Sequence, residues 1–259
     1  MIQRIVIICL LAFCCLPAQA QPPVLVPQVL NTYPHDPGAF TQGLLWHGGA
    51  LYESTGLRGR SSLRRVDIET GLPEVNLPLD DAYFAEGLER VGDRLIQLTW
   101  QSGLAFVYDF PSLELIETIE YVGEGWGLCS DGRFLFMSDG SPYLSLRDQD
   151  SFELIFRGAV TLDGQLIPSQ LLNELECVDE QIYANAWNTD YIFRIDKFTG
   201  NIIALIDASA LLTDAERASL SPGSVLNGIA YNPESQTFYI TGKNWPKLFE
   251  VVFVAQEDG

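Results

Sequence analysis

The pattern of apolar and polar residues in this chain repeats five times. Each repeat opens with a short apolar stretch around a Gly or Leu and continues through further strand-like runs. The openings are Thr41-Gln42-Gly43-Leu44, Ala85-Glu86-Gly87-Leu88, Gly125-Trp126-Gly127-Leu128, Asn173-Glu174-Leu175-Glu176 and Leu226-Asn227-Gly228-Ile229. A spacing of roughly forty to fifty residues per four-stranded unit is typical of β-propellers. The pattern therefore predicts an all-β fold, a five-bladed β-propeller.

The second repeat shows the expected strands most clearly. Turn residues at Gly92-Asp93, Ser102-Gly103 and Pro111-Ser112 separate its apolar runs. Because Gly, Pro, Asp and Ser favour turns, the runs between them are interpreted as strands. The predicted strands span residues 84–91, 94–100, 104–110 and 113–121.

The last repeat has room for only three strands, at residues 227–232, 237–242 and 247–254. The apolar stretch at 24–33 precedes the first full repeat, and we expect it to supply the missing fourth strand. This N-terminal strand would close the ring and remove an exposed sheet edge. A capping box, Thr213-x-x-Glu216, predicts one short helix in the connection before the last repeat.

The first twenty residues have the features of a secretory signal peptide. Arg4 precedes an apolar run over residues 5–16, and Ala18-Gln19-Ala20 matches a cleavage site for signal peptidase. We therefore expect residues 1–20 to be removed and residues 21–259 to form a single catalytic propeller domain. The location expected for the mature chain is secreted or periplasmic.

The charge of the chain limits its partners. The net charge of −19 becomes −20 without residues 1–20, because Arg4 is their only charged residue. Such an acidic protein is a poor ligand for nucleic acid or for an anionic membrane surface. We expect a monomer that binds no nucleic acid and, after cleavage of the signal, no membrane.

Only two of the five cysteines, Cys129 and Cys177, lie outside the first twenty residues. A disulfide-rich scaffold is therefore excluded. We expect two small buried thiols in the core, and a single disulfide formed in an oxidising compartment is the alternative.

In a propeller the first strand of every blade lines the central axis. The residues just before the Gly or Leu of each repeat would then face one shared space, and they are Gln42, Glu86, Trp126, Glu174 and Asn227. A packing position would tend to repeat one apolar residue, whereas this one contains carboxylates and amides. The ends of the second strands add Trp100, Trp187 and Lys243. This set predicts a ligand site with aromatic walls.

Each of these residues also has a purely structural interpretation. Glu86 lies in an apolar context that argues against a solvated strand face, whereas the nearby Glu176 leaves the register of Glu174 open. The tryptophans could instead pack between blades, and Lys243 could be an exposed loop residue. The chain has only two histidines, His35 and His47. A histidine-rich zinc site or a Ser/His/Asp triad is therefore hardly possible.

Several motifs resemble those of one enzyme family. The longest is Tyr33-Pro34-His35-Asp36-Pro37-Gly38-Ala39-Phe40-Thr41-Gln42-Gly43-Leu44, and others are Phe84-Ala85-Glu86-Gly87-Leu88, Gly123-Glu124-Gly125-Trp126-Gly127-Leu128, Asn173-Glu174-Leu175-Glu176, Asn185-Ala186-Trp187 and Thr241-Gly242-Lys243. Together they are similar to the plant and bacterial glutaminyl cyclases, over about residues 33–252. The resemblance implies a five-bladed propeller that converts N-terminal glutamine of peptides or proteins to pyroglutamate and releases ammonia.

The resemblance also implies roles for individual residues. Glu86 matches the acid/base of the family, and Lys243 is expected to act beside it in catalysis. The residues expected around the substrate are Phe40, Gln42, Phe84, Trp100, Trp126, Asn173, Glu174, Trp187 and Asn227. No cofactor or metal is implied for catalysis. Some plant members carry structural metal ions, whose ligands this sequence does not identify.

Two other functions remain open from the residues alone. A metal-dependent propeller lactonase or hydrolase could use Glu86, Asn173 and Asn227 as oxygen ligands for an axial calcium ion. A propeller that binds peptides without catalysis could use the same tryptophans. Lys243 near the same mouth argues against the calcium site.

Overall fold

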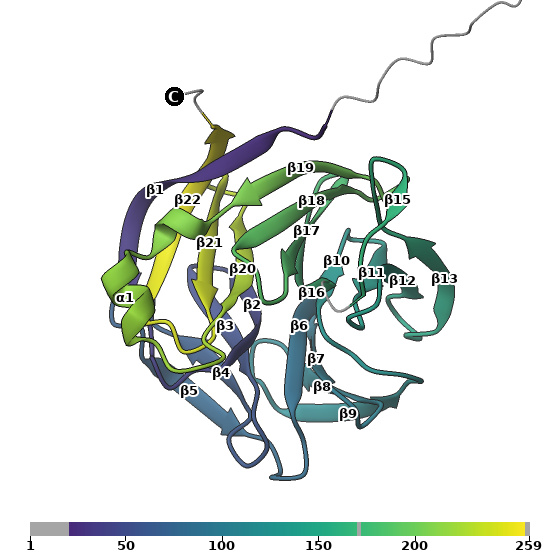
Figure 1. The fold of residues 1–259 in the computed structure, drawn as a ribbon. Helices are drawn as coiled ribbons and strands as arrows, with labels where there is room; N and C mark the ends of the chain where they lie inside the picture. Colours follow the sequence, from purple (N-terminus) through teal and green to yellow (C-terminus); the bar gives the residue numbers. More distant parts are fainter. Residues whose placement is uncertain (1–20, 170–171, 257–259) are drawn as a thin grey trace, which may run out of the picture.

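The computed structural model describes residues 21–169 and 172–256. Within them the fold is built almost entirely of β-strands, which form three four-stranded sheets, one eight-stranded sheet and a two-stranded hairpin. The predicted all-β class is thus correct. Figure 1 shows the sheets arranged in a propeller-like manner, with the first strand of each repeat toward the middle.

The three four-stranded sheets follow the order of the sequence. The first contains β2 (Thr41–His47), β3 (Ala50–Thr55), β4 (Ser62–Val66) and β5 (Pro73–Pro78). The second contains β6 (Ala85–Val91), β7 (Arg94–Thr99), β8 (Leu104–Asp109) and β9 (Leu115–Glu120). The third contains β10 (Leu128–Ser130), β11 (Phe134–Met137), β12 (Tyr143–Asp148) and β13 (Leu154–Ala159). The strands predicted in the second repeat are therefore confirmed to within two residues at each end.

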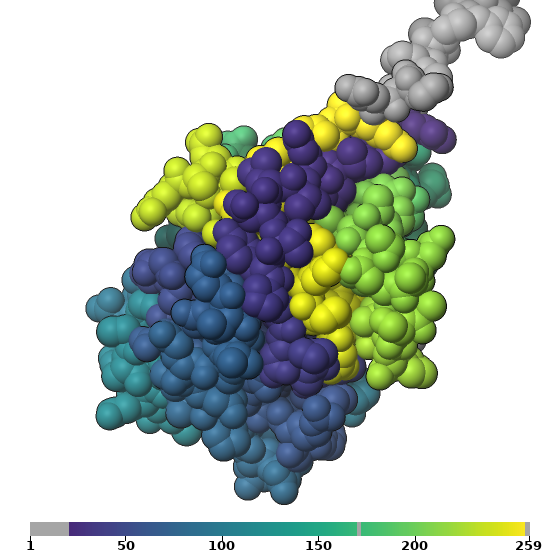
Figure 2. All heavy atoms as spheres, turned by 90° about the vertical axis from the view of Figure 1, so that its left-hand side faces the viewer, coloured from purple at the N-terminus to yellow at the C-terminus, as the bar shows by residue number. Residues whose placement is uncertain are grey.

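The eight-stranded sheet joins the two ends of the chain. It contains β16 (Leu172–Val178), β17 (Gln181–Ala186), β18 (Tyr191–Asp196), β19 (Ile202–Asp207), β1 (Val24–Pro34), β22 (Lys247–Ala255), β21 (Thr237–Gly242) and β20 (Leu226–Asn232). β1 pairs antiparallel with β22 along nearly its whole length. It also pairs in parallel with β19 at Val24 and Leu25, a contact that the sequence did not predict. Figure 2 shows β1 on the surface beside β22.

The first strands of the five repeats contact one another in a cycle. β2 contacts β6, β6 contacts β10, β10 contacts β16, β16 contacts β20 and β20 contacts β2. The repeated glycine of the sequence pattern explains this close approach. A Cβ atom at Gly43 would lie 2.6 Å from the Leu88 nitrogen, and one at Gly87 would lie 2.7 Å from the Leu128 nitrogen. Only glycine lets the backbones meet at this distance.

Buried carboxylates link these first strands. Glu174 on β16 accepts hydrogen bonds from the backbone N–H groups of Leu44 on β2, at 3.3 Å, and Ile229 on β20, at 2.9 Å. Glu89 on β6 accepts one from the N–H of Ser130 on β10 at 2.9 Å. A buried backbone N–H group needs an acceptor, and here a glutamate side chain of another repeat supplies it.

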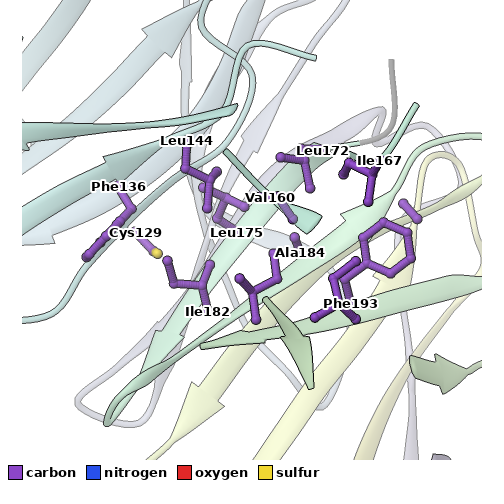
Figure 3. Close-up of a cluster of buried hydrophobic side chains, with 13 residues drawn as sticks. Cys129, Phe136, Leu144, Val160, Ile167, Leu172, Leu175, Ile182, Ala184 and Phe193 are labelled. Carbon is purple, nitrogen blue, oxygen red and sulfur yellow. The ribbon is translucent and has the colours of Figure 1, made fainter. Parts of the chain in front are cut away.

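Apolar clusters fill the spaces between neighbouring sheets. Figure 3 shows the cluster between the third sheet and the β16–β19 strands, where Cys129 and Phe136 pack with Leu175 and Ile182. The two-stranded hairpin, β14 (Thr161–Leu162) and β15 (Gln165–Leu166), lies in the connection between these two sheets.

The predicted helix is confirmed. α1 (Asp214–Ser219) begins after Thr213, whose side chain accepts from the Glu216 backbone while the Glu216 side chain accepts from the Thr213 backbone. A single 3₁₀ turn, η1 (Ser209–Leu211), precedes it. Of the helices in the described residues, none is long and apolar enough to cross a membrane. The predicted signal segment, 1–20, lies outside the described residues.

The prediction of two free thiols is wrong. Cys129 on β10 and Cys177 on β16 form a disulfide, with their Cα atoms 5.4 Å apart. This separation is near the middle of the range found for disulfides. The two cysteines are 48 residues apart in sequence, and only the packing of β10 against β16 brings them together.

The disulfide should contribute measurably to stability. Replacing both Cys129 and Cys177 with Ser should lower the free energy of unfolding by roughly 2–4 kcal/mol, because the bond closes a long loop in the unfolded chain. Urea unfolding with and without a reductant measures this effect. The reductant should lower the midpoint of the wild type and leave the double variant unchanged. Equal midpoints for the oxidised wild type and the double variant would contradict a stabilising bond.

Candidate active site

A cavity of about 280 Å³ lies where the first strands meet the ends of the second strands. Its lining consists of Phe40, Gln42, Phe84, Glu86, Trp100, Trp126, Asn173, Trp187, Asn188, Gly223 and Lys243. Every residue that the sequence analysis assigned to the site is among them except Glu174 and Asn227. Asn188 and Gly223 were not predicted.

Irregular strand pairing positions the polar residues of the cavity. The pairing of the first and second strands shifts register between Thr41 and Gly43, between Ala85 and Leu88 and between Leu172 and Leu175. Gln42, Glu86 and Asn173 lie within these three shifts. Such bulges turn side chains out of the regular alternation, and they are common next to active sites.

Glu86 is the buried carboxyl group of the cavity, with 4% of its surface exposed. Its Oε1 accepts a hydrogen bond from Gln42 Nε2 at 3.1 Å, whereas its Oε2 has no partner among the described residues. Burial raises the pKa of Glu86 well above its ordinary value, against the opposing charge of Lys243 and with a smaller contribution from Glu124. The site therefore holds a carboxyl group that retains its proton at higher pH than usual and keeps one oxygen available.

A short chain of hydrogen bonds fixes Gln42. Asn227 donates from Nδ2 to the Thr41 carbonyl at 2.9 Å and to Gln42 Oε1 at 3.3 Å. The Gln42 carboxamide therefore presents its nitrogen to Glu86. Asn227 was expected to contact a substrate directly, but its side chain lies behind Gln42 and orients it.

Lys243 lies in the cavity wall and is not an exposed loop residue. Only 4% of its surface is exposed, and its Nζ is 5.0 Å from the centre of the Phe40 ring. Burial lowers its pKa to about 8, although the nearby Glu86 opposes the shift. The ammonium group and the aromatic ring attract each other, which helps to hold the charge in this apolar place.

The aromatic walls pack edge to face. The ring centroids of Phe84 and Trp100 are 5.6 Å apart, and those of Trp126 and Trp187 are 5.5 Å apart. The three tryptophans line the cavity, and the contact between Trp126 and Trp187 also joins two sheets. Trp245, in contrast, is not part of the lining and is fully buried in a hydrophobic cluster.

Glu124 is a site residue that the sequence analysis did not select. Its Oε2 accepts hydrogen bonds from the indole Nε1 atoms of Trp100 at 2.7 Å and Trp126 at 3.0 Å. The signal was present in the motif Gly123-Glu124-Gly125-Trp126, where an acidic residue lies two positions before a cavity tryptophan.

Glu174 does not line the cavity, despite its place in the same column of the repeat as Glu86. Its two oxygens accept the backbone N–H groups of Leu44 on β2 and Ile229 on β20. Glu174 was expected to contact the substrate. In the structure its side chain instead links β16 to β2 and β20.

Metal binding is the alternative role for the polar side chains of the cavity. In the part of the chain that the structure describes, no three His, Cys, Asp or Glu residues are grouped to hold a metal ion. Of the oxygen donors considered for an axial calcium ion, Glu86 and Asn173 line the cavity, whereas Asn227 does not.

A larger cavity, of about 750 Å³, lies between the third sheet and the β17–β19 strands. Its walls are mainly apolar, and two of its four charged residues, Asp131 and Lys197, pair with each other at 3.0 Å. Glu86, Lys243 and the cavity tryptophans are not among its lining residues, so the smaller cavity is the candidate active site.

Comparison with known proteins places the chain among the cyclotransferases. Residues 4–253 match the glutamine cyclotransferase family. The chain is 40% identical over 230 residues to a glutaminyl-peptide cyclotransferase of Arabidopsis thaliana, an alignment that covers 86% of this chain and 70% of the plant protein. It is also similar to the crystal structure of the glutaminyl cyclase of Myxococcus xanthus, with a TM-score of 0.85 and 41% identity over 92% of this chain and all of that one. The chain belongs to the glutamine cyclotransferase family.

Proposed function

We propose that this protein is a glutaminyl-peptide cyclotransferase that converts the N-terminal glutamine of peptides or proteins to pyroglutamate. The observation that carries the proposal is Glu86, a buried carboxyl group with an unpartnered oxygen beside Lys243 and aromatic walls. Membership of the glutamine cyclotransferase family supports it. So do the names of the two similar proteins from a plant and a bacterium.

The fold that we propose for this activity is a five-bladed β-propeller. The cycle of contacts among β2, β6, β10, β16 and β20 supports five blades around one axis. The pairing of β1 with β22 supports closure of the ring by the N-terminal strand, which completes the last blade. The site would then lie at one mouth of the central channel.

The cavity suits a single residue at the end of a peptide. Its volume of about 280 Å³ is near the lower limit for a ligand pocket. The aromatic rings would enclose the glutamine side chain, and the carboxamides of Gln42 and Asn173 can hydrogen-bond its amide. Holding the side chain bent toward its own amine would supply much of the rate, since ring closure is intramolecular.

The chemical step requires the net movement of one proton from the attacking amine to the leaving nitrogen. The neutral α-amine attacks the side-chain carbonyl carbon, a carbon–nitrogen bond forms, the bond to the amide nitrogen breaks, and ammonia leaves. Glu86 can donate a proton to the leaving nitrogen and recover one from the attacking amine, so the carboxyl group is unchanged at the end. Its raised pKa suits this shuttle, because the acid form persists to higher pH than in an ordinary glutamate.

Negative charge develops on the carbonyl oxygen during the attack. The Lys243 ammonium group is the positive charge of the cavity that we assign to this oxygen, and the amides of Gln42 and Asn173 are additional donors. Such groups stabilise a transition state most strongly in a dry site. We propose no metal or other cofactor for catalysis.

The proposed location of the mature enzyme is outside the cytoplasm, secreted or periplasmic. The sequence of residues 1–20 supports export. The disulfide between Cys129 and Cys177 also supports it, because disulfides persist in oxidising compartments.

The activity can be tested with the pure protein and two peptides of the same composition. The peptide that begins with glutamine should lose one ammonia, as measured by mass spectrometry, and the peptide with an internal glutamine should remain unchanged. Prior treatment with a strong chelator should leave the rate unchanged in protein that remains folded by circular dichroism.

Two results would favour the other candidate functions. Binding of the first peptide without loss of ammonia would indicate a peptide-binding protein. Loss of activity on chelation, restored by calcium or zinc, would indicate a metal-dependent enzyme such as a lactonase.

Glu86→Gln should reduce turnover by roughly a hundredfold to ten-thousandfold, the usual contribution of a positioned acid/base. The change preserves the size of the side chain and removes the group that titrates. Peptide affinity and the unfolding midpoint should change little. The steady-state kcat and a binding titration measure these effects.

The matched control is Glu174→Gln, at the same column of the repeat. An amide can accept only one of the two backbone N–H groups that Glu174 now accepts, so the variant should lose about 1–3 kcal/mol of stability. Its kcat should stay within a few-fold of the wild type at a temperature where it is folded. A collapse of turnover in Glu174→Gln, with Glu86→Gln still active, would move the catalytic role to Glu174.

The alkaline limb of the pH profile should report on Lys243. Its pKa of about 8 means that the ammonium charge is lost as the pH rises through this value, so kcat should fall there. Lys243→Arg should shift that fall to higher pH, because a guanidinium group stays charged. The acidic limb, set by the α-amine of the substrate, should be the same in both proteins. If the alkaline limb does not move in Lys243→Arg, the fall in kcat is caused by another group.

A further inference from the structure

The carboxylate of Glu124 connects two walls of the cavity that come from different sheets. Trp100 follows β7 of the second sheet, and Trp126 precedes β10 of the third. The indole N–H groups of both donate to the same oxygen of Glu124, Oε2, at 2.7 Å and 3.0 Å. An indole has only one N–H group, so Glu124 takes the whole donor capacity of both tryptophans.

The backbone holds Glu124 in place for these contacts. The N–H of Gly125 donates to the Trp100 carbonyl at 3.1 Å, and the N–H of Trp126 donates to the Ser138 carbonyl at 3.0 Å. The second carboxylate oxygen, Oε1, accepts from Gln101 Nε2 at 3.1 Å. The carboxylate thus has hydrogen-bond partners on both oxygens and little freedom to rotate.

Glu124 also links the two aromatic pairs of the cavity into one wall. Trp100 packs edge to face with Phe84, and Trp126 packs edge to face with Trp187. These four rings are the greater part of the apolar lining. The shared hydrogen bonds to Glu124 fix the angle between the pairs, which sets the shape of the space beside Glu86.

The charge state of Glu124 favours this role. Partial burial opposes its ionisation, but the hydrogen bonds from Trp126, Gln101 and Trp100 outweigh burial and hold its pKa below the ordinary value. The group is therefore a carboxylate near neutral pH. Hydrogen bonds to a charged acceptor are about twice as strong as those between neutral groups.

We propose that Glu124 is a positioning residue, whose carboxylate ties Trp100 and Trp126 together so that the N-terminal glutamine of the substrate is held against Glu86. The inference rests on the proposed function for the identity of the substrate. Glu124 itself takes no part in proton transfer.

Two substitutions separate the position of the rings from the charge. Glu124→Ala removes both indole contacts. Glu124→Gln keeps an oxygen that can accept from both indoles, because a single oxygen does so in the wild type. The new amide nitrogen would face Gln101, whose own carboxamide can turn to present its oxygen. Glu120→Ala, at an exposed glutamate of the neighbouring strand β9, is the matched control.

We expect Glu124→Ala to lower kcat by roughly tenfold to a hundredfold, the cost of misplacing a reacting group by about one ångström. Its unfolding midpoint should remain close to that of the wild type, and its tryptophan emission should shift, because two indoles lose a charged partner. Glu124→Gln should recover most of the rate and bind the glutamine peptide with nearly wild-type affinity. Glu120→Ala should match the wild type in every respect.

Three outcomes would overturn the inference. One is wild-type kcat and emission in Glu124→Ala. Another is a loss of kcat in Glu124→Ala that parallels a large loss of stability, which would mark a merely structural residue. The third is a Glu124→Gln variant as impaired as Glu124→Ala, since charge and not ring position would then matter.

The same variants distinguish this inference from the proposed function. If the wild type does not release ammonia from the peptide, the proposed function fails, and the inference is decided by the binding titration alone. Weakened binding in Glu124→Ala with recovery in Glu124→Gln would then still support a positioning role, and unchanged binding would overturn it.

Discussion

The close approach of the first strands at the centre of the molecule is the constraint on which the rest of the structure depends. Glycines such as Gly43 and Gly87 allow one backbone to reach the next within a distance that no side chain permits. Side chains on these strands, such as Gln42, Glu86 and Glu174, are buried. The polar backbone groups of these strands must therefore find partners in other repeats, and a carboxyl group placed there is desolvated.

Two kinds of buried carboxyl group follow from this constraint. Glu174 and Glu89 accept backbone N–H groups from the first strands of other repeats and act as links within the scaffold. Glu86 receives one side-chain hydrogen bond and keeps an unpartnered oxygen. The same burial thus produces structural glutamates where donors are plentiful and a reactive one where the cavity opens. The Glu124 carboxylate, less buried, shapes the wall that faces Glu86.

The strands and most of the site could be predicted from the sequence because both follow the repeat. Turn residues marked the strand ends, and the repeated column gave Gln42 and Glu86. The column alone could not show that Asn227 and Glu174 serve the scaffold, because pairing shifts at each bulge decide where a side chain points. The Cys129–Cys177 bond and the Glu124 contacts depend on how separate sheets pack, which no local pattern encodes.

The central claim is that burial keeps Glu86 protonated so that it can exchange protons with the substrate. Infrared difference spectra between the wild type and Glu86→Gln, recorded across a pH series, isolate the carbonyl band of this one carboxyl group. The account predicts a protonated band that persists at neutral pH and disappears only well above the ordinary glutamate pKa of about 4.3. A band that vanishes near that ordinary value would show a carboxylate ionised throughout the working range, and would contradict the account.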